Sequence, residues 1–228
     1  MSETWYLLES GEGQAAANMG MDEALLAAVT SLMHPVLRFY GWIEKAGSFG
    51  YSQRCEEIEK ITHLRPLVRR PTGGGFVPHD ADWTYSVALP PNHAWYQLRA
   101  EESYQRIHEW IQASFQLMDV PTELAPVCRK EVPGQCFLGA ERHDLLWFGR
   151  KIAGAAQRRT KQGLLIQGSV QPPPISLDRS GWHKAMCDAA KQMFDATWMP
   201  MKLDEAFSTR VAALVDTKYS LPSWNRKR

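Results

Sequence analysis

The 228-residue sequence lacks the features that mark membrane-spanning, secreted and metal-binding proteins. No apolar run reaches the roughly 18 residues that a membrane-spanning helix needs, and the first residues show no basic stretch followed by a small-residue cleavage site. The seven histidines include no His-Glu-x-x-His, and no two of the four cysteines have Cys-x-x-Cys spacing. We therefore expect a cytoplasmic protein with reduced thiols and no metal site.

An excess of charge of either sign is also missing. The 26 Lys and Arg residues nearly balance the 25 Asp and Glu residues, so no surplus of cations is available to neutralise the phosphates of a nucleic acid. Hydrophobic residues make up 44% of the chain and charged residues 22%, as in ordinary globular proteins. Because no repeat or low-complexity linker interrupts the chain, we expect residues 1–228 to form a single α+β domain.

Periodicity and composition predict a sheet-forming middle between helical ends. Apolar residues at helical spacing predict helices over 18–31, 52–61, 96–118, 182–199 and 203–215. Runs rich in β-branched and aromatic residues predict strands over 36–42, 67–70, 83–89, 144–148, 151–157 and 164–170. We expect a tight hairpin turn at 149–150 and a loop over 120–139. The three prolines at 172–174 end the sheet region.

The first candidate site is Arg69-Arg-Pro-Thr-Gly-Gly-Gly75, which is followed by His79-Asp80. Three adjacent glycines after a strand leave the backbone N–H groups unshielded, so a ligand can approach them closely. Arg70 beside them can bind a carboxylate or a phosphate. The segment is not a Walker loop, because no Gly-Lys-Ser/Thr follows, and it lacks the Gly-x-Gly-x-x-Gly of a dinucleotide fold. A flexible turn is the alternative interpretation.

Two further candidates lie near the predicted hairpin. Residues 153–156 are all Ala or Gly and leave room for a ligand or another backbone, and Lys151 can point into that room. A solvated lysine is the alternative. Cys136 lies in the preceding loop, where a thiolate would be a strong nucleophile if an ammonium lowered its pKa. We interpret Cys55 and Cys187 as small buried hydrophobic residues.

Three segments in this order resemble the lipoate–protein ligase and octanoyltransferase family, which is related to biotin–protein ligase. They are residues 18–26 (NMGMDEALL), 69–80 (RRPTGGGFVPHD), and 149–159 (GRKIAGAAQRR) together with Gln167-Gly-Ser169. Residues 218–225 are similar to the family's C-terminal signature, so the resemblance covers roughly residues 5–226. It implies the class II synthetase-like catalytic fold of that family, a central mixed β-sheet flanked by helices.

The resemblance also implies roles for individual residues. The family's acyl chain lies in a tunnel beside the arginine- and glycine-rich strand, and its invariant lysine, which contacts the reacting acyl carbonyl, matches Lys151. The pocket residues that it implies are Arg70, Thr72, Gly73, Gly74, Gly75, His79, Gly154 and Gln167. The family usually has His where this chain has Gln167. An amide hydrogen-bonds but carries no proton at neutral pH, so this departure argues against an acid/base role there.

Two reactions are compatible with the resemblance. Ligases activate free lipoate with ATP and magnesium, whereas transferases move octanoyl from acyl carrier protein through an enzyme cysteine to a lysine of a lipoyl domain or of glycine-cleavage H protein. Cys136 matches the nucleophile of the cysteine-dependent transferases, residues 71–72 and 83–87 are also more similar to those transferases, and we expect no accessory C-terminal domain. The resemblance therefore favours octanoyl or lipoyl transfer without a cofactor, and without a nucleic-acid or membrane partner.

Three alternatives stay open. They are an ATP-dependent lipoate ligase whose accessory domain is a separate polypeptide, an amidotransferase acting between two carrier domains, and a noncatalytic acyl- or carrier-binding protein. In the favoured mechanism Cys136 attacks as a thiolate, while Lys151 lowers its pKa and hydrogen-bonds the developing oxyanion. The base that deprotonates the target lysine is not identified, although His79 is a candidate.

Overall fold

The computed structural model describes residues 2–130 and 139–227. The main sheet has the strand order β13-β1-β2-β6-β12-β11-β10-β7. In that order the strands are Ala196–Pro200, Glu3–Gly13, Val36–Trp42, Trp83–Leu89, Gly163–Val170, Arg150–Thr160, Leu145–Trp147 and Glu123–Leu124. The first three are parallel and the following pairs are antiparallel, so the sheet is mixed, as predicted.

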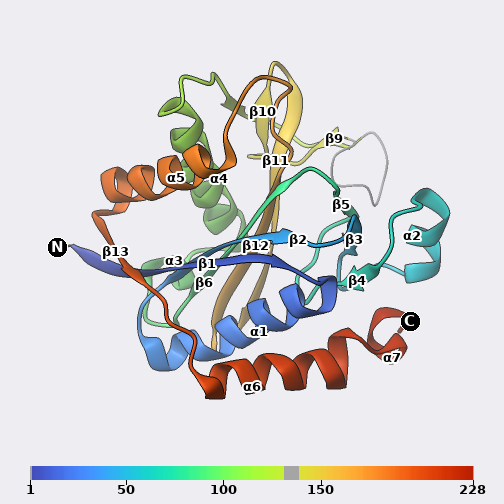
Figure 1. The fold of residues 1–228 in the computed structure, drawn as a ribbon. Helices are drawn as coiled ribbons and strands as arrows, with labels where there is room; N and C mark the ends of the chain where they lie inside the picture. The colour runs from blue at the N-terminus through green and yellow to red at the C-terminus, as the bar shows by residue number, and fades with distance from the viewer. Residues whose placement is uncertain (1, 131–138, 228) are drawn as a thin grey trace.

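Helices cover both faces of this sheet (Figure 1). On one face lie α4 (Ala100–Gln116) and α5 (Arg179–Phe194), and on the other α1 (Ala15–Leu32) and α6 (Glu205–Leu214). The shorter helical segments are α2 (Cys55–Ile61), α3 (Ala94–Gln97), η1 (Val215–Tyr219) and α7 (Pro222–Asn225). The predicted α+β class is confirmed. In the two described stretches, every helix is too short or too polar to cross a membrane.

Two small sheets stand beside the main one. The first has the strand order β4-β3-β5, formed by Leu67–Arg69, Ala46–Phe49 and Val77–His79. The second pairs β8 (Arg129–Lys130) with β9 (Gly139–Ala140). The three-stranded sheet carries the glycine-rich segment between β4 and β5, so it holds that segment beside the main sheet.

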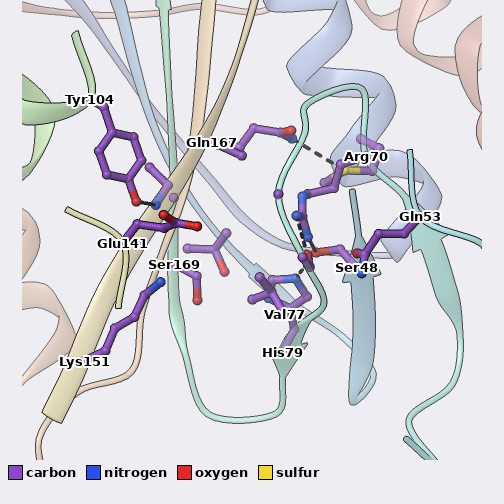
Figure 2. Close-up of a pocket in the computed structure, with 18 of the residues that line it drawn as sticks. Ser48, Gln53, Arg70, Val77, His79, Tyr104, Glu141, Lys151, Gln167 and Ser169 are labelled. Atoms are coloured by element: carbon purple, nitrogen blue, oxygen red, sulfur yellow. Dashed lines mark hydrogen bonds between the residues drawn. The ribbon is translucent and has the colours of Figure 1, made fainter. Parts of the chain in front are cut away.

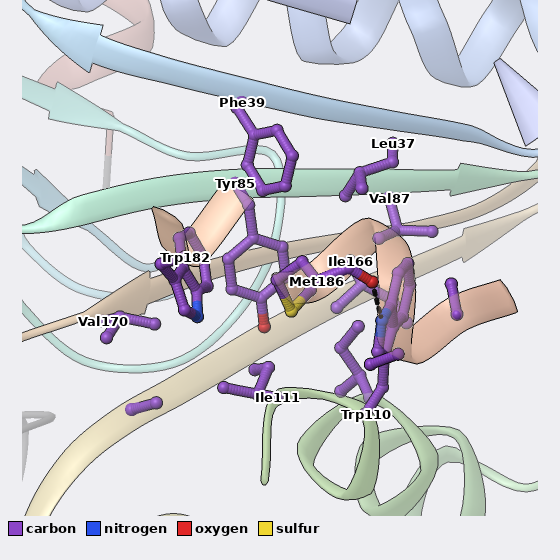
Figure 3. Packing of buried hydrophobic residues seen from close by; sticks show 14 of the residues in the cluster. Leu37, Phe39, Tyr85, Val87, Trp110, Ile111, Ile166, Val170, Trp182 and Met186 are labelled. Carbon is purple, nitrogen blue, oxygen red and sulfur yellow. Dashed lines mark hydrogen bonds between the residues drawn. The ribbon is translucent and has the colours of Figure 1, made fainter. Parts of the chain in front are cut away.

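The two faces of the central strands differ in polarity, because successive side chains of a strand point to opposite faces. Leu37, Val87 and Ile166 are paired neighbours that pack against Trp110 of α4 and Met186 of α5 (Figure 3). The residues that alternate with them, Arg38, Ser86 and Gln167, are equally buried but polar. One face is therefore the hydrophobic core, and the other is a buried polar surface that needs hydrogen-bond partners.

The structure corrects three predicted elements and adds a strand. The helix predicted over 182–199 ends at Phe194, where Asp195 takes φ 53°, and residues 196–200 instead form an edge strand beside β1. A helix that ends on a left-handed Asp lacks the usual Gly signal. Strand β1 itself was not predicted, and the helix predicted over 96–118 is divided into α3 and α4. The hairpin turn is Phe148-Gly149, because Trp147 pairs with Arg150.

Candidate active site

A cavity of about 290 Å³ opens on the polar face of the main sheet. Strands β11 and β12 form one wall, and the other is formed by β3, β5 and the glycine-rich segment, with Lys151 and His79 on opposite sides (Figure 2). The sequence-predicted residues among those lining it are Arg70, Gly74, Gly75, His79, Lys151, Gly154 and Gln167. Thr72 and Gly73 contact these lining residues, and Cys136 lies outside the described residues.

Lys151 reaches the cavity because β11 contains a β-bulge. Leu145 pairs with Ala153 whereas Leu146 pairs with Lys151, so Ile152 is the extra residue. A Cβ atom on Gly154 would lie 2.8 Å from Cε and 2.9 Å from Nζ of Lys151. The glycine therefore makes the space that the lysine occupies. The lysine side chain is only 6% exposed, so it is not the solvated lysine of the alternative interpretation.

A fully buried carboxylate pairs with this ammonium. Nζ of Lys151 lies 2.7 Å from Oδ2 of Asp144, and the Tyr104 hydroxyl of α4 donates a hydrogen bond to Oδ1. Burial and the nearby Asp144 charge raise the pKa of Tyr104 well above its usual range, so the phenol keeps its proton and remains a donor. Sequence reasoning missed both Asp144 and Tyr104, because partners from three different elements leave no local motif.

The opposite wall is braced by Arg70. Its guanidinium donates to the Ser48 hydroxyl at 2.7 Å and to the carbonyl oxygens of Gly73 and Gly75 at 3.0 and 2.7 Å. Gly74 has φ +82°, a conformation that favours glycine. A Cβ on Gly50 would lie 1.9 Å from the Gly74 carbonyl oxygen, so the two backbones touch. The glycine-rich segment is thus a fixed turn rather than the flexible turn of the alternative interpretation.

Ser48, His79 and Asp82 form a directed hydrogen-bond chain beside Arg70. Because a guanidinium only donates, the Ser48 oxygen accepts from Arg70 and its own proton is left for Nε2 of His79, 2.6 Å away. Nδ1 of His79 lies 2.8 Å from Oδ2 of Asp82, which also accepts from the Ser169 hydroxyl at 2.6 Å. Nδ1 is therefore the donor to Asp82, and in the tautomer with the proton on Nδ1 the Nε2 atom faces Ser48 as an acceptor.

The His79 ring also has an aromatic neighbour. The ring of Trp42 stacks on it with 3.8 Å between centroids, and the Trp42 indole N–H donates to Thr84 at 2.8 Å. Thr84 in turn donates to Asp82 at 3.1 Å. The histidine is 5% exposed. Hydrogen bonds at both ring nitrogens and the stacked indole on one face fix the orientation of the ring.

Gln167 connects the cavity to a buried ion pair beneath it. Its amide oxygen accepts from the Thr72 hydroxyl at 2.7 Å, and its amide nitrogen donates to Asp22 of α1, also at 2.7 Å. Asp22 is paired with Arg38, at 2.7 Å, and accepts from Ser86. The position thus requires one acceptor and one donor, which a neutral imidazole also offers. A proton carrier is not required there.

The described thiols differ in environment. Burial raises the pKa of Cys187 to about 12 and raises that of Cys55, so both stay protonated. Cys55 is buried, as predicted, whereas Cys187 is only partly buried against the core. Cys128 is exposed and donates to Glu141, a cavity-lining residue that sequence reasoning missed. Across residues 2–130 and 139–227, no three His, Cys, Asp or Glu side chains are grouped to hold a metal ion.

The mixed sheet thus carries a buried lysine on one side of a cavity whose other side is a glycine-rich turn. The model of the lipoyl protein ligase A/B catalytic domain matches residues 14–180. The chain belongs to this family.

Curated relatives carry the name octanoyltransferase LipM. The proteins from Staphylococcus aureus (strain NCTC 8325 / PS 47) and Bacillus subtilis (strain 168) are 36% and 38% identical, over 75% and 74% of this chain. The matches cover 66% and 65% of those relatives, so the chain spans slightly under two thirds of their length.

Solved structures share the fold at low identity. A Thermoplasma acidophilum protein with bound lipoic acid is 20% identical, with a TM-score of 0.81 over 100% of both chains. A lipoate-protein ligase A bound with ATP is 20% identical, with a TM-score of 0.80 over 99% of both chains. A third similar chain comes from a structural analysis of a bipartite lipoate protein ligase and its E2 lipoyl domain, also from T. acidophilum. It is 19% identical, with a TM-score of 0.77 over 99% of this chain and 96% of that one.

Proposed function

We propose that this protein is an acyltransferase of protein lipoylation. It moves an octanoyl group from acyl carrier protein through a Cys136 thioester to a lysine of a lipoyl domain. The buried Lys151–Asp144 pair is the main support, because it fixes a cation at a cavity with a largely small-residue wall. The names of the curated relatives also favour octanoyl transfer over ligation.

The first step exchanges one thioester for another. The Cys136 thiolate attacks the carbonyl carbon of the carrier-bound octanoyl group, a C–S bond to Cys136 forms, and the C–S bond to the carrier breaks. The carrier thiolate leaves and takes up the proton that Cys136 gave up. Lys151 donates a hydrogen bond to the negative oxygen of the tetrahedral intermediate, and Asp144 holds it in position. Such an exchange is nearly isoenergetic and requires no nucleotide.

The second step forms an amide and releases the enzyme thiol. The attacking lysine starts as an ammonium and must lose two protons as the C–N bond forms and the C–S bond breaks. One proton passes to the Ser48 oxygen while the Ser48 proton moves to Nε2 of His79, and the other goes to the departing sulfur. Asp82 then stabilises the imidazolium, as a carboxylate does in a Ser-His-Asp triad. The stacked Trp42 ring stabilises the cation further.

The cavity also offers an apolar wall to the acyl chain. Met19, Tyr40, Trp42 and Val77 contribute to this wall. Each methylene buried there adds about 0.8 kcal/mol to binding, so affinity rises with chain length until the cavity is full. We infer that a medium-length acyl chain is selected by the depth of the cavity.

Intact-mass spectrometry tests this function directly. The protein is incubated with octanoyl carrier protein and no nucleotide, and we expect the mass to increase by one octanoyl group. Cys136→Ser should abolish the increase, whereas Cys128→Ser, a control at an exposed thiol, should retain it. A wild type that stays unmodified, together with a lipoyl domain that gains mass only with lipoate, ATP and magnesium, would instead identify a ligase.

A further inference from the structure

An exposed aromatic residue occupies the tip of the β10–β11 hairpin. Phe148 is 80% exposed and has φ +45°, a conformation in which a bulky side chain is an outlier. Gly149, the next residue, has φ +76°, so the turn belongs to the two-residue kind that favours Asn-Gly. Asparagine at 148 would suit both the backbone and the solvent better, and neither local folding nor solubility explains the phenylalanine.

The residues around Phe148 resemble the centre of a protein–protein contact. The Trp147 ring lies 4.8 Å from the Phe148 ring in an edge-on arrangement, and Trp147 is itself half-buried against the core. The side chain of Arg150, on the other side of the turn, is exposed. An anchored aromatic pair with an adjacent arginine has the composition of binding hot spots. We call Trp147, Phe148 and Arg150 the hairpin tip.

The hairpin tip lies next to the reaction centre. Phe148 precedes Lys151 by three residues, so their Cα atoms are at most about 11 Å apart. A carrier protein presents its acyl group on a long prosthetic arm and can dock at a distance. An acceptor domain reaches the thioester only with the side chain of its target lysine, so its surface must lie close to the cavity. This difference in reach selects the acceptor as the occupant.

We propose that the hairpin tip is the docking contact for the acceptor domain, with Phe148 as its anchor and Arg150 as a partner for an acidic residue of that domain. The proposal rests on the proposed octanoyl transfer. It predicts that Phe148 has been retained for binding although it disfavours the turn. Substitution by a residue suited to the turn should therefore raise stability and weaken acceptor binding together.

Phe148→Asn and a matched control test this prediction. Met33 ends α1 with φ +58° and is 54% exposed, so Met33→Asn relieves the same kind of backbone conformation away from the hairpin. We expect both variants to melt at a higher temperature than the wild type. In single-turnover discharge of the octanoyl-enzyme, only Phe148→Asn should raise the half-saturating concentration of a lipoyl domain, by about tenfold or more.

Two measurements separate docking from damage to the site. Loading from octanoyl carrier protein, and discharge to hydroxylamine, which needs no docking, should be unchanged in both variants. An unchanged half-saturating concentration in Phe148→Asn would overturn the proposal. Slower loading would assign the tip to the donor, and slower discharge to hydroxylamine would show a disturbed Lys151, so either result also overturns it.

The docking contact can be tested even if the proposed function fails. If the wild type is never acylated, calorimetric titration with the lipoyl domain still compares the binding of wild type, Phe148→Asn and Met33→Asn. Weaker binding in Phe148→Asn alone supports the contact independently of the chemistry. Equal binding of all three proteins, or no binding, rejects it.

Discussion

Replacing Asp144 by Asn should lower the stability of the protein, because it breaks the buried ion pair with Lys151. Asp144 is fully buried and the Lys151 side chain is 6% exposed, so the substitution removes the Asp144 charge from an ion pair that is shielded from water. Breaking a buried pair on one side costs about 3–5 kcal/mol. For a protein of this size, 1 kcal/mol corresponds to roughly 2–4 °C in melting temperature, so we expect a decrease of about 6–20 °C.

A double variant provides the control. Replacing both charges, in Asp144→Asn with Lys151→Met, removes the ammonium together with the carboxylate, and such replacements are often neutral or stabilising. We therefore expect the double variant to recover most of the lost melting temperature while octanoyl loading is abolished, because the oxyanion donor is gone. Thermal unfolding and single-turnover loading from octanoyl carrier protein measure the two effects. If Asp144→Asn alone matched the wild type in both assays, the assigned role of the pair would be wrong.

Two further predictions concern histidines. His79→Gln removes the proton acceptor next to Ser48, so transfer from the octanoyl-enzyme to a lipoyl domain should slow by about 10²-fold or more, whereas loading should change little. Equal slowing of both half-reactions would contradict the relay. Burial lowers the pKa of His108 to about 4. Between this pH and about 6.5 the unfolded chain therefore binds a proton at His108, whereas the native protein does not. Stability from this residue is therefore present above about pH 6.5 and is lost as the pH falls towards 4, by about 3 kcal/mol, and His108→Gln should flatten that part of the pH–stability curve. A curve of unchanged shape in the variant would assign the acid loss to other groups.

The central strands and the long helices could be predicted because their signals are local. Residues 36–42, 83–89 and 164–170 are rich in β-branched, aliphatic and aromatic residues, and the structure places strands at all three. Strand β1 was missed because its sequence, ETWYLLESGEG, mixes polar residues and glycine, and it is a strand because β2 and β13 pair with it on either side. Such pairing is a long-range effect that a window of sequence does not contain.

The candidate site divides in the same way. The glycine-rich segment, Lys151 and Gln167 stood out as motifs, and the structure brings them to one cavity. Asp144, Tyr104 and Ser48 were missed because each acts through a partner on another element. A resemblance identifies residues that match a pattern, whereas these three are recognisable only once the chain is folded.

The extra residue in β11 has a consequence for changes in chain length. By simple alternation Lys151 would share a face with Ala153, whose partner Val170 belongs to the hydrophobic core. Deleting Ile152 would make Lys151 the direct neighbour of Ala153, so regular alternation would keep the lysine on the cavity face while the core lost the buried Ile152 side chain. Loss of this one residue should therefore lower the stability of the fold more than it moves the lysine, because the bulge adds a side chain to the core without changing the face on which the ammonium lies.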